Sequence, residues 1–326
     1  MNSFGRIFRI QIFGESHGKE VGILIDGCPP GIAFNINELQ ALLDRRKPGM
    51  KGTTSRIEED IPLIKSGIFN EHTTGSPILI SFLNKYHNSN DYNSLQNIAR
   101  PGHSDFTNYK KYKGFNNPYG GGHSSGRLTL GIVTAGYFAK KILKDVKISA
   151  KLIEINGNTD FDYELNNAIN KNDSVGGIVE LMVENLEVGL GEPFFDSIES
   201  VISHIIFSIP AIKGIEFGAG FKSSKMFGSE MNDEIIDSSG KTKTNNSGGI
   251  NGGISNGNPL IFRVAVKPTS SISKIQSSIN LIDGAQTEIQ IRGRHDVCIA
   301  LRMLVIIESA VAITLADLFL INKSYN

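Results

Sequence analysis

The feature that most constrains the fold of this chain is its most apolar segment, residues 301–320. The segment is long enough to form a membrane-spanning helix, but it carries Arg302, Glu308 and Asp317, which the interior of a bilayer does not readily tolerate. We therefore expect a helix over about residues 297–321 that is buried in a protein core. Hydrophobic residues make up 40% of the 326 residues, so a sizeable core is possible.

The remaining pattern combines short strands with amphipathic helices. Strands are predicted at residues 5–13, 21–26, 77–83, 146–155, 177–184, 214–220 and 259–266. Helices are predicted from Asn35 or Asn37 to residue 46, over residues 124–143, and after a capping pair of Asp196 and Glu199. Polar loops are predicted at residues 84–97 and 238–257. Strands and helices do not alternate regularly, which favours the α+β class with antiparallel sheets over a doubly wound sheet. No segment resembles a linker, so one domain over residues 1–326 is expected.

Charge and cysteine content exclude several classes of protein. The 33 basic and 33 acidic residues cancel, which argues against nucleic-acid binding but permits a local basic pocket for a small anion. Cys28 and Cys298 have no metal-ligand spacing, so no metal site is expected, and their scarcity suits a reducing compartment. Residues 1–11 lack the apolar run of a signal peptide. We expect a cytoplasmic protein without a membrane partner.

Two histidines lie in glycine-containing loops far apart in the chain. His17 is part of Phe-Gly-Glu-Ser-His-Gly at residues 13–18, and His103 is part of Arg-Pro-Gly-His-Ser-Asp at 100–105. Histidine can gain or lose a proton near neutral pH. The pair predicts one acid–base site assembled from distant segments, although each could instead be a surface histidine.

Arginines accompany these loops. Arg46 ends the first predicted helix together with Arg45, and a cation there either complements the helix C-terminus or binds an anion. Residues 120–127, Gly-Gly-Gly-His-Ser-Ser-Gly-Arg, open the next helix, a position that favours anions but can also be a simple turn. A positive charge on Arg127 at this helix start would be unfavourable with the helix dipole, so its presence there favours a bound anion that compensates it. Arg100 and Arg127 could converge with Arg46.

Two later motifs offer further polar groups. Lys-Pro-Thr-Ser-Ser at residues 267–271 follows a strand and could bind a phosphate or the pyrimidine edge of a flavin, or form a capped turn. Arg-Gly-Arg-His-Asp at 292–296 precedes the last helix. Asp296 could cap that helix or accept a proton.

Taken in order, these motifs resemble the chorismate synthase family over residues 5–317. Asp-Gly-Cys-Pro-Pro-Gly at 26–31, Asp-Arg-Arg-Lys-Pro-Gly at 44–49 and Gly-Gly-Ile-Ser-Asn-Gly at 252–257 add to the resemblance. It implies a β-α-β sandwich with helices between antiparallel sheets, and a homotetramer. It also implies the anti 1,4-elimination of phosphate from 5-enolpyruvylshikimate 3-phosphate to give chorismate, the last common step of aromatic amino-acid biosynthesis. The cofactor would be reduced FMN, which lends electron density and takes the ring hydrogen.

The resemblance also implies roles for individual residues. His17 would protonate the departing phosphate, His103 would lie beside the flavin, and Asp296 would relay a proton. The residues expected to bind substrate are Arg46, Arg100, Arg127 and Ser125. The residues expected to bind the cofactor are His123, Ser124, Ser125, Ala211, Gly252, Lys267, Pro268, Thr269, Ser270, Ser271 and Arg294.

Departures from the family pattern keep two alternatives in view. Many relatives have arginine where this chain has His123, and the loop after Gly49 is short. One alternative is a flavin-binding relative that has lost lyase activity. The other is a bifunctional form that also reduces FMN with NADPH, although no separate nicotinamide-binding motif is present.

Overall fold

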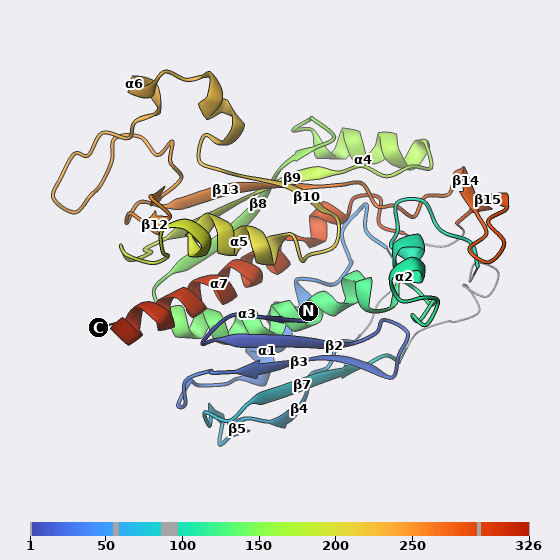
Figure 1. The fold of residues 1–326 in the computed structure, drawn as a ribbon, viewed down its shortest axis with the longest axis horizontal. Helices are drawn as coiled ribbons and strands as arrows, with labels where there is room; N and C mark the ends of the chain where they lie inside the picture. Colours follow the sequence, from blue (N-terminus) through green and yellow to red (C-terminus); the bar gives the residue numbers. More distant parts are fainter. Residues whose placement is uncertain (1, 55–58, 86–96, 292–294, 326) are drawn as a thin grey trace.

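The structure is a computed structural model that describes residues 2–54, 59–85, 97–291 and 295–325. Two antiparallel sheets enclose a layer of helices (Figure 1). This arrangement confirms the predicted α+β class and the β-α-β sandwich.

The first sheet consists of β1 (Ser3–Phe4), β2 (Arg9–Gly14), β3 (Glu20–Asp26), β7 (Ile78–Leu83) and β4 (Leu63–Ser66), in that spatial order and antiparallel throughout. Successive side chains of a strand point to opposite faces, so alternate apolar residues line one face. In β7, Ile78, Ile80 and Phe82 are fully buried. They pair across to β3, where Ile23 lies opposite Ile80, so this face of the sheet is continuous with the helical core.

The second sheet consists of β10 (Ile212–Phe217), β13 (Leu260–Val266), β9 (Gly177–Glu184) and β8 (Lys147–Ile155), also antiparallel. In β9 every second side chain is buried, as the alternation in the sequence predicts. Val179 of β9 lies opposite Val264 of β13, and both are fully buried. The inner face of this sheet therefore forms the other boundary of the core.

The helices between the sheets are α3 (Thr129–Leu143), α5 (Ile198–Ile206) and α7 (Leu304–Tyr325), and α1 (Ile36–Asp44) packs against α3. A side chain at Gly136 of α3 would come within 2.3 Å of the Cβ atom of Ser309, so the two central helices touch almost backbone to backbone. By length and composition α7 could cross a membrane, but 78% of its most apolar window is buried inside the protein. This burial confirms the predicted core helix.

The acidic residues of α7 that argue against a membrane span have hydrogen-bonding and ion-pair partners inside the protein. Glu308 of α7 forms a bidentate ion pair with Arg45 and a third contact with Lys140 of α3. Asp317, near the other end of α7, accepts hydrogen bonds from the backbone N–H groups of residues 6–8 at 2.7–2.8 Å. The last helix thus holds the first segment of the chain in place.

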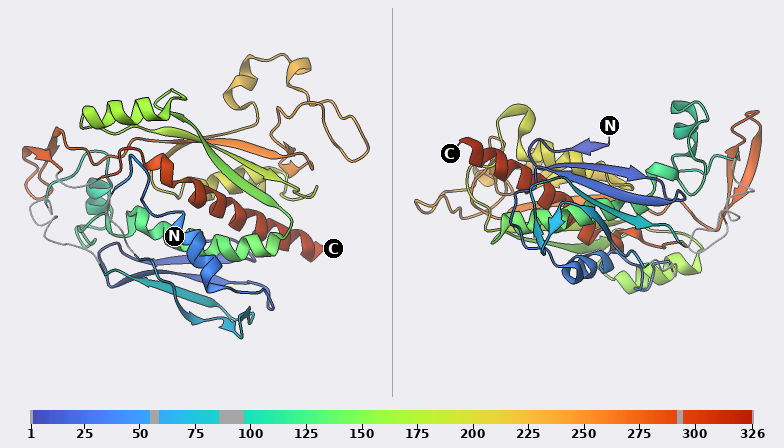
Figure 2. Two further views of the ribbon diagram at one scale, coloured as in Figure 1. Left: turned by 180° about the vertical axis from the view of Figure 1, so that it is seen from behind. Right: turned by 90° about the horizontal axis from the view of Figure 1, so that it is seen from below.

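Smaller elements decorate the two ends of the sandwich (Figure 2). Next to each other at one end lie α2 (Asp105–Lys111) and the hairpin of β14 (Ile275–Ile279) and β15 (Gln286–Gln290), whereas α6 (Gly228–Met231) lies on an arm that projects at the other. The outer face of the second sheet carries α4 (Phe161–Asn170). The remaining elements are β5 (Ile68–Phe69), β6 (His72–Thr73), β11 (Ile250–Asn251), β12 (Ile254–Ser255) and the 3₁₀ turns η2 (Gly122–Ser124), η3 (Gly126–Leu128), η4 (Phe194–Asp196), η5 (Gly220–Lys225) and η6 (Ile299–Arg302).

Several local predictions need correction. Asn35, one of two candidate caps, caps α1, because its side chain accepts from the N–H groups of residues 37 and 38. The expected capping pair of Asp196 and Glu199 is wrong: Ser197 caps α5, since Asp196 belongs to a separate 3₁₀ turn. The helix expected from residue 124 begins as two 3₁₀ turns, and the expected loop at 238–257 contains the β11–β12 hairpin. Residues 86–96 of the other expected loop lie outside the described part of the chain.

Candidate active site

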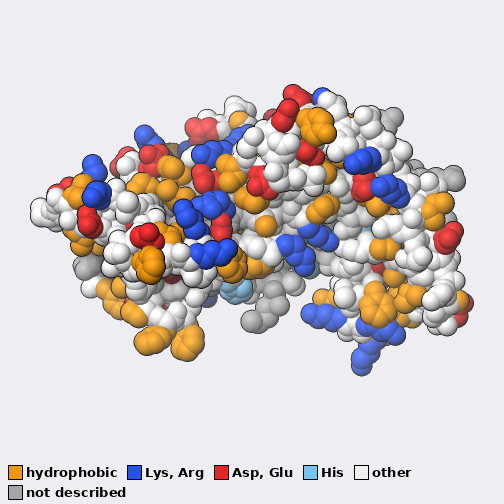
Figure 3. Space-filling view, turned by 90° about the horizontal axis from the view of Figure 1, so that it is seen from above, with side chains coloured by type: hydrophobic (Ala, Val, Ile, Leu, Met, Phe, Trp, Pro, Cys, Tyr) orange, Lys and Arg blue, Asp and Glu red, His pale blue; other side chains and the backbone are white. Residues whose placement is uncertain are grey.

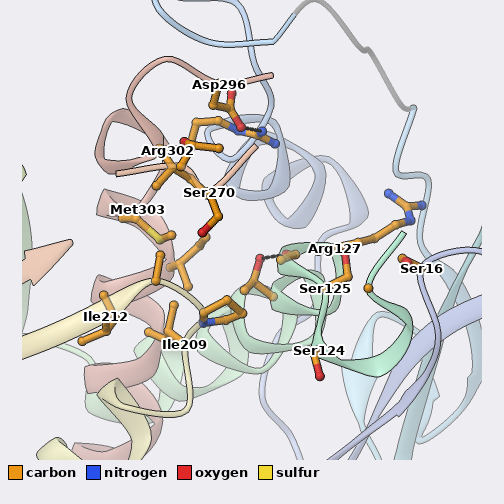
Figure 4. Close-up of a pocket in the computed structure, with 18 of the residues that line it drawn as sticks. Ser16, Ser124, Ser125, Arg127, Ile209, Ile212, Ser270, Asp296, Arg302 and Met303 are labelled. Carbon is orange, nitrogen blue, oxygen red and sulfur yellow. Dashed lines mark hydrogen bonds and ion pairs between the residues drawn. The ribbon is translucent and has the colours of Figure 1, made fainter. Parts of the chain in front are cut away.

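A cavity with a volume of about 720 Å³ lies where the two central helices begin. Residues just before and within the first turns of α3 and α7 form part of its wall. Figure 4 shows Ile209, Ile212 and Met303 on one side, with Arg127 and Ser16 on the other. The wall is built from residues 16–17, 46–48, 54, 60, 102–104, 120–121, 124–127, 129, 207–213, 267–270, 295–296, 299, 302–303 and 306.

Cationic side chains outnumber carboxylates on the described wall. The cations are Arg46, Lys47, Arg127, Lys213, Lys267 and Arg302, and the carboxylates are Asp60 and Asp296. The partial positive charge at the starts of α3 and α7 adds to this balance. The cavity is therefore suited to a small ligand with several negative charges.

Two carboxylates, each paired with arginine, hold this wall. Asp60 contacts Nη2 of Arg46 at 2.6 Å and Nη1 of Arg127 at 2.8 Å. Asp296 contacts Nη1 of Arg302 at 3.0 Å and accepts from the backbone N–H of Thr54 at 2.8 Å. Asp296 does not cap the last helix, so its interpretation as a cap is wrong. No motif in the sequence had marked Asp60 or Arg302 as site residues.

The His17 ring lies against the glycine run of residues 120–122. A Cβ atom at Gly120 would come within 2.0 Å of Cε1 of His17, so only glycine leaves room for the ring in this position. The φ angle of Gly120 is +61°, which also favours glycine. Nδ1 of His17 lies 3.1 Å from Oγ of Ser16. The motif at residues 13–18 and the glycine run at residues 120–122 thus meet at the imidazole of His17.

Asn84 anchors the loop that carries His17. Its amide nitrogen donates to the backbone oxygens of Glu15 and Gly18, and its amide oxygen accepts from Nε of Arg127. The histidine loop and a wall arginine are therefore joined through one buried side chain.

His103 is half-buried beside the Lys-Pro-Thr-Ser-Ser segment. Its Nε2 atom lies 2.9 Å from Oγ of Ser271. Burial, followed by the charge of Arg100, lowers the pKa of His103 to about 4, although Asp105 acts in the opposite direction. His103 is therefore neutral at physiological pH and can accept a proton or donate a hydrogen bond.

The Lys-Pro-Thr-Ser-Ser segment is bonded directly to the second histidine loop. Nζ of Lys267 donates to the backbone oxygen of Gly102 at 2.8 Å, and Oγ of Ser270 donates to the same oxygen at 2.9 Å. Ala211 also lines the cavity and has a φ angle of +76°, a sparsely populated region for a residue other than glycine. The sequence motifs at 100–105 and 267–271 are thus one structural unit.

Most predicted site residues converge on this cavity, but some do not. Arg100 lies behind the wall in a bidentate pair with Asp105. Ser271 also lies behind the wall, where its hydroxyl group contacts the wall residue His103. His123 is exposed and bonds the backbone oxygen of Gly14. Gly252 lies in the β11–β12 hairpin and is absent from the wall. Arg294 lies outside the described residues. The wall contains His17, Arg46, His103, Ser124, Ser125, Arg127, Ala211, Lys267, Pro268, Thr269, Ser270 and Asp296.

Comparisons with known proteins agree with the motifs. The sequence model of the family described as chorismate synthase matches residues 8–320. A chorismate synthase of Chitinophaga pinensis is 56% identical, with 100% of this chain and 98% of the relative covered. One from Dehalococcoides mccartyi is 44% identical, with 98% and 96% covered. A solved structure, described as the crystal structure of chorismate synthase, matches with a TM-score of 0.77 at 26% identity and covers 98% of this chain and 93% of that one.

Proposed function

The chain belongs to the chorismate synthase family, and we propose that its cavity carries out the family's reaction with reduced FMN. The chain is a lyase that eliminates phosphate from 5-enolpyruvylshikimate 3-phosphate to give chorismate. The observation that supports this location is the meeting of two histidine loops and an excess of cations on one wall. No observation favours a relative that has lost the lyase activity.

The residues present fit a flavin phosphate or ring. Nε of Arg46 and Oγ1 of Thr269 are buried on the cavity wall without a hydrogen-bond partner among the described residues, and such orphaned groups are costly unless a ligand satisfies them. Ser124, Ser125, Ala211 and residues 267–270 would hold the flavin. When bound, reduced FMN supplies electron density for the departure of phosphate and a base for the ring proton.

The chain's own residues supply charge and protons. Arg46 and Arg127 would bind the anionic groups of the substrate and stabilise negative charge on the departing phosphate, a contribution commonly worth about 3–4 kcal/mol. His17 would donate a proton to that phosphate. His103, neutral at physiological pH, would orient the cofactor by hydrogen bonding. Asp296, held by Arg302, would pass the ring proton to solvent.

Several broader properties belong to the same proposal. We infer a homotetramer in the cytoplasm that binds neither nucleic acid nor a membrane. Figure 3 shows Lys and Arg side chains mixed with Asp and Glu over most of one face, which supports the proposal that nucleic acid is not a partner. Exposed aromatic side chains such as Phe195, Phe221 and Phe227 support association between copies.

An anaerobic assay of phosphate and chorismate formation tests the function. The substrate is 5-enolpyruvylshikimate 3-phosphate, with chemically reduced FMN in one arm and oxidised FMN in the other. Turnover only with reduced flavin is expected. Turnover with oxidised flavin, or none in either arm, would overturn the proposal. A third arm with oxidised FMN and NADPH asks whether this chain reduces its own flavin.

A further inference from the structure

Asp60 sits between the two arginines assigned above to the substrate. Its two oxygens each contact a different guanidinium, Oδ2 that of Arg46 and Oδ1 that of Arg127. The side chain of Asp60 is 1% exposed, and those of the two arginines are 8% and 9% exposed. One carboxylate therefore fixes the position of two buried cations relative to each other.

The backbone of Asp60 is held in an uncommon conformation. Its φ angle is +51°, in the left-handed region that aspartate tolerates better than most residues but still populates rarely. Such a conformation persists only where the surroundings determine it strongly, and these sites cluster at functional positions. The strained residue here is the one whose side chain meets the cavity arginines.

The far sides of both arginines are held as well. Nε of Arg127 donates to Asn84, which in turn anchors the loop of residues 15–18. The backbone oxygen of Arg46 accepts from Nε of Arg302 at 3.0 Å. Asp60 is thus the central link of a chain of contacts that runs from η6, just before α7, to the loop carrying His17.

Asp60 offsets the unfavourable surroundings of the buried Arg46 guanidinium. Burial lowers the pKa of Arg46, Asp60 opposes that effect, and the nearby charges of Arg302 and Arg127 reinforce it. Two guanidinium groups facing one cavity repel each other, and a shared carboxylate keeps both in place before a ligand arrives. Groups that are fixed in advance bind a ligand without a further entropic cost.

We propose that Asp60 is a positioning residue, which sets the spacing of Arg46 and Arg127 so that they receive the phosphate or carboxylate of the substrate together. Asp60 itself does not touch the substrate. This inference rests on the proposed function of the cavity, and it adds the residue that organises the anion site.

The test uses Asp60→Asn, which keeps the size of the side chain but presents an amide N–H₂ group to one of the arginines. Binding of 5-enolpyruvylshikimate 3-phosphate is measured by titration calorimetry on protein that holds oxidised FMN, where no turnover is expected. The dissociation constant should rise about 10-fold to 100-fold, as for other small misplacements of binding groups. The KM measured with reduced FMN should rise more than kcat falls.

A matched control is Glu308→Gln. Glu308 is also a buried carboxylate between two cations, but it does not line the cavity. This variant should lower the unfolding temperature and leave the dissociation constant within about 2-fold of the parent. Asp60→Glu, which keeps the charge, serves if Asp60→Asn does not fold, and its dissociation constant should rise about 10-fold.

The outcomes separate this inference from the proposed function. Parent protein that turns over with reduced FMN, together with Asp60→Asn that binds substrate as the parent does, would overturn the positioning role alone. Equal loss of binding in Asp60→Asn and Glu308→Gln would also overturn it, because general destabilisation would then explain both. Parent protein that neither binds nor converts the substrate would overturn the proposed function.

Discussion

Arg45 and Arg46 are neighbours in the chain but serve different parts of the molecule. Arg45 contacts Glu308 at 2.7 and 2.8 Å, and Glu308 also accepts from Lys140. Arg46 pairs instead with Asp60 on the cavity wall. The core cluster is Arg45, Lys140 and Glu308, and the cavity cluster is Arg46, Asp60 and Arg127.

Both clusters set one buried carboxylate between two cations, but the cations of the core cluster are more exposed to solvent than those of the cavity cluster. The core cluster joins α7 to α3 and to the end of α1, and none of its members lines the cavity. Burial acts to raise the pKa of Glu308, but Arg45 and Lys140 outweigh it, and the pKa falls below its usual value. The same charge pattern therefore ties helices together in one place and faces a ligand cavity in the other.

The largest effect is expected on the cavity side, from His17→Ala. Loss of the proton donor should lower turnover about 10²-fold to 10⁴-fold, with little change in the unfolding temperature. Phosphate release with reduced FMN gives the rate, and circular dichroism on heating gives the stability. Turnover near that of the parent would remove His17 from the chemistry and weaken the distinction between the two clusters.

Gly120→Ala should disturb the packing of the same histidine. The added methyl group would overlap the His17 ring, so we expect the ring to be displaced and turnover to fall by about 10²-fold. Gly157→Ala is the matched control, because Gly157 also has a positive φ angle but open space around it. Both variants should lose some stability, and only Gly120→Ala should lose activity; equal activities would disprove the displacement.

Glu308→Gln should lower stability and leave the rate of turnover unchanged, which is the opposite of the result expected for His17→Ala. We expect the free energy of unfolding at pH 7 to fall by about 1–3 kcal/mol, because Arg45 and Lys140 lose a buried, charged acceptor. Glu308 has its lowered pKa only in the folded state, so its contribution is full above about 4.5, its ordinary value, and is lost as the pH falls through the folded value. Urea unfolding of parent and variant should therefore converge in acid, and a constant difference would contradict the assignment.

The last prediction concerns the pH dependence of stability at His103. The pKa of His103 is about 4 when folded and about 6.5 when unfolded, so the unfolded chain binds more protons between these values. Stability should fall as the pH drops from 6.5 towards 4, and His103→Gln should reduce that fall. Urea titrations at pH 7 and pH 5 measure it. Parallel curves for the two proteins would show that His103 is not buried in its neutral form.

Much of the fold could be predicted because its signals are local. Strand β9 was placed at its observed bounds, since alternate burial leaves a two-residue period. The buried helix α7 was predicted because its apolar residues form one long segment. The order of the layers needed the family resemblance, because periodicity does not determine which elements pair. Strands β4, β14 and β15 were missed, since they are short and none has more than one buried residue.

The candidate site divides in a similar way. His17 and His103 were found because histidine beside glycine is a local signal. Asp60 and Arg302 were missed because each also contacts an arginine far away in the chain: Asp60 pairs with Arg127, 67 residues away, and Arg302 donates to the backbone oxygen of Arg46, 256 residues away. The resemblance assigned His123 and Gly252 to the flavin, but the structure places neither on the cavity wall. Their assignment to the flavin stays a prediction.

The hydrogen bonds from residues 6–8 to Asp317 have a consequence for how the protein is made. The first segment emerges from the ribosome long before the carboxylate that will hold it. The cavity is equally late, because Met303 and Ile306 close one side of it. A growing chain can form local hairpins, but it has no finished pocket until its last helix is released. A cofactor can therefore bind only to the completed polypeptide, and protein truncated before this helix would be released without one.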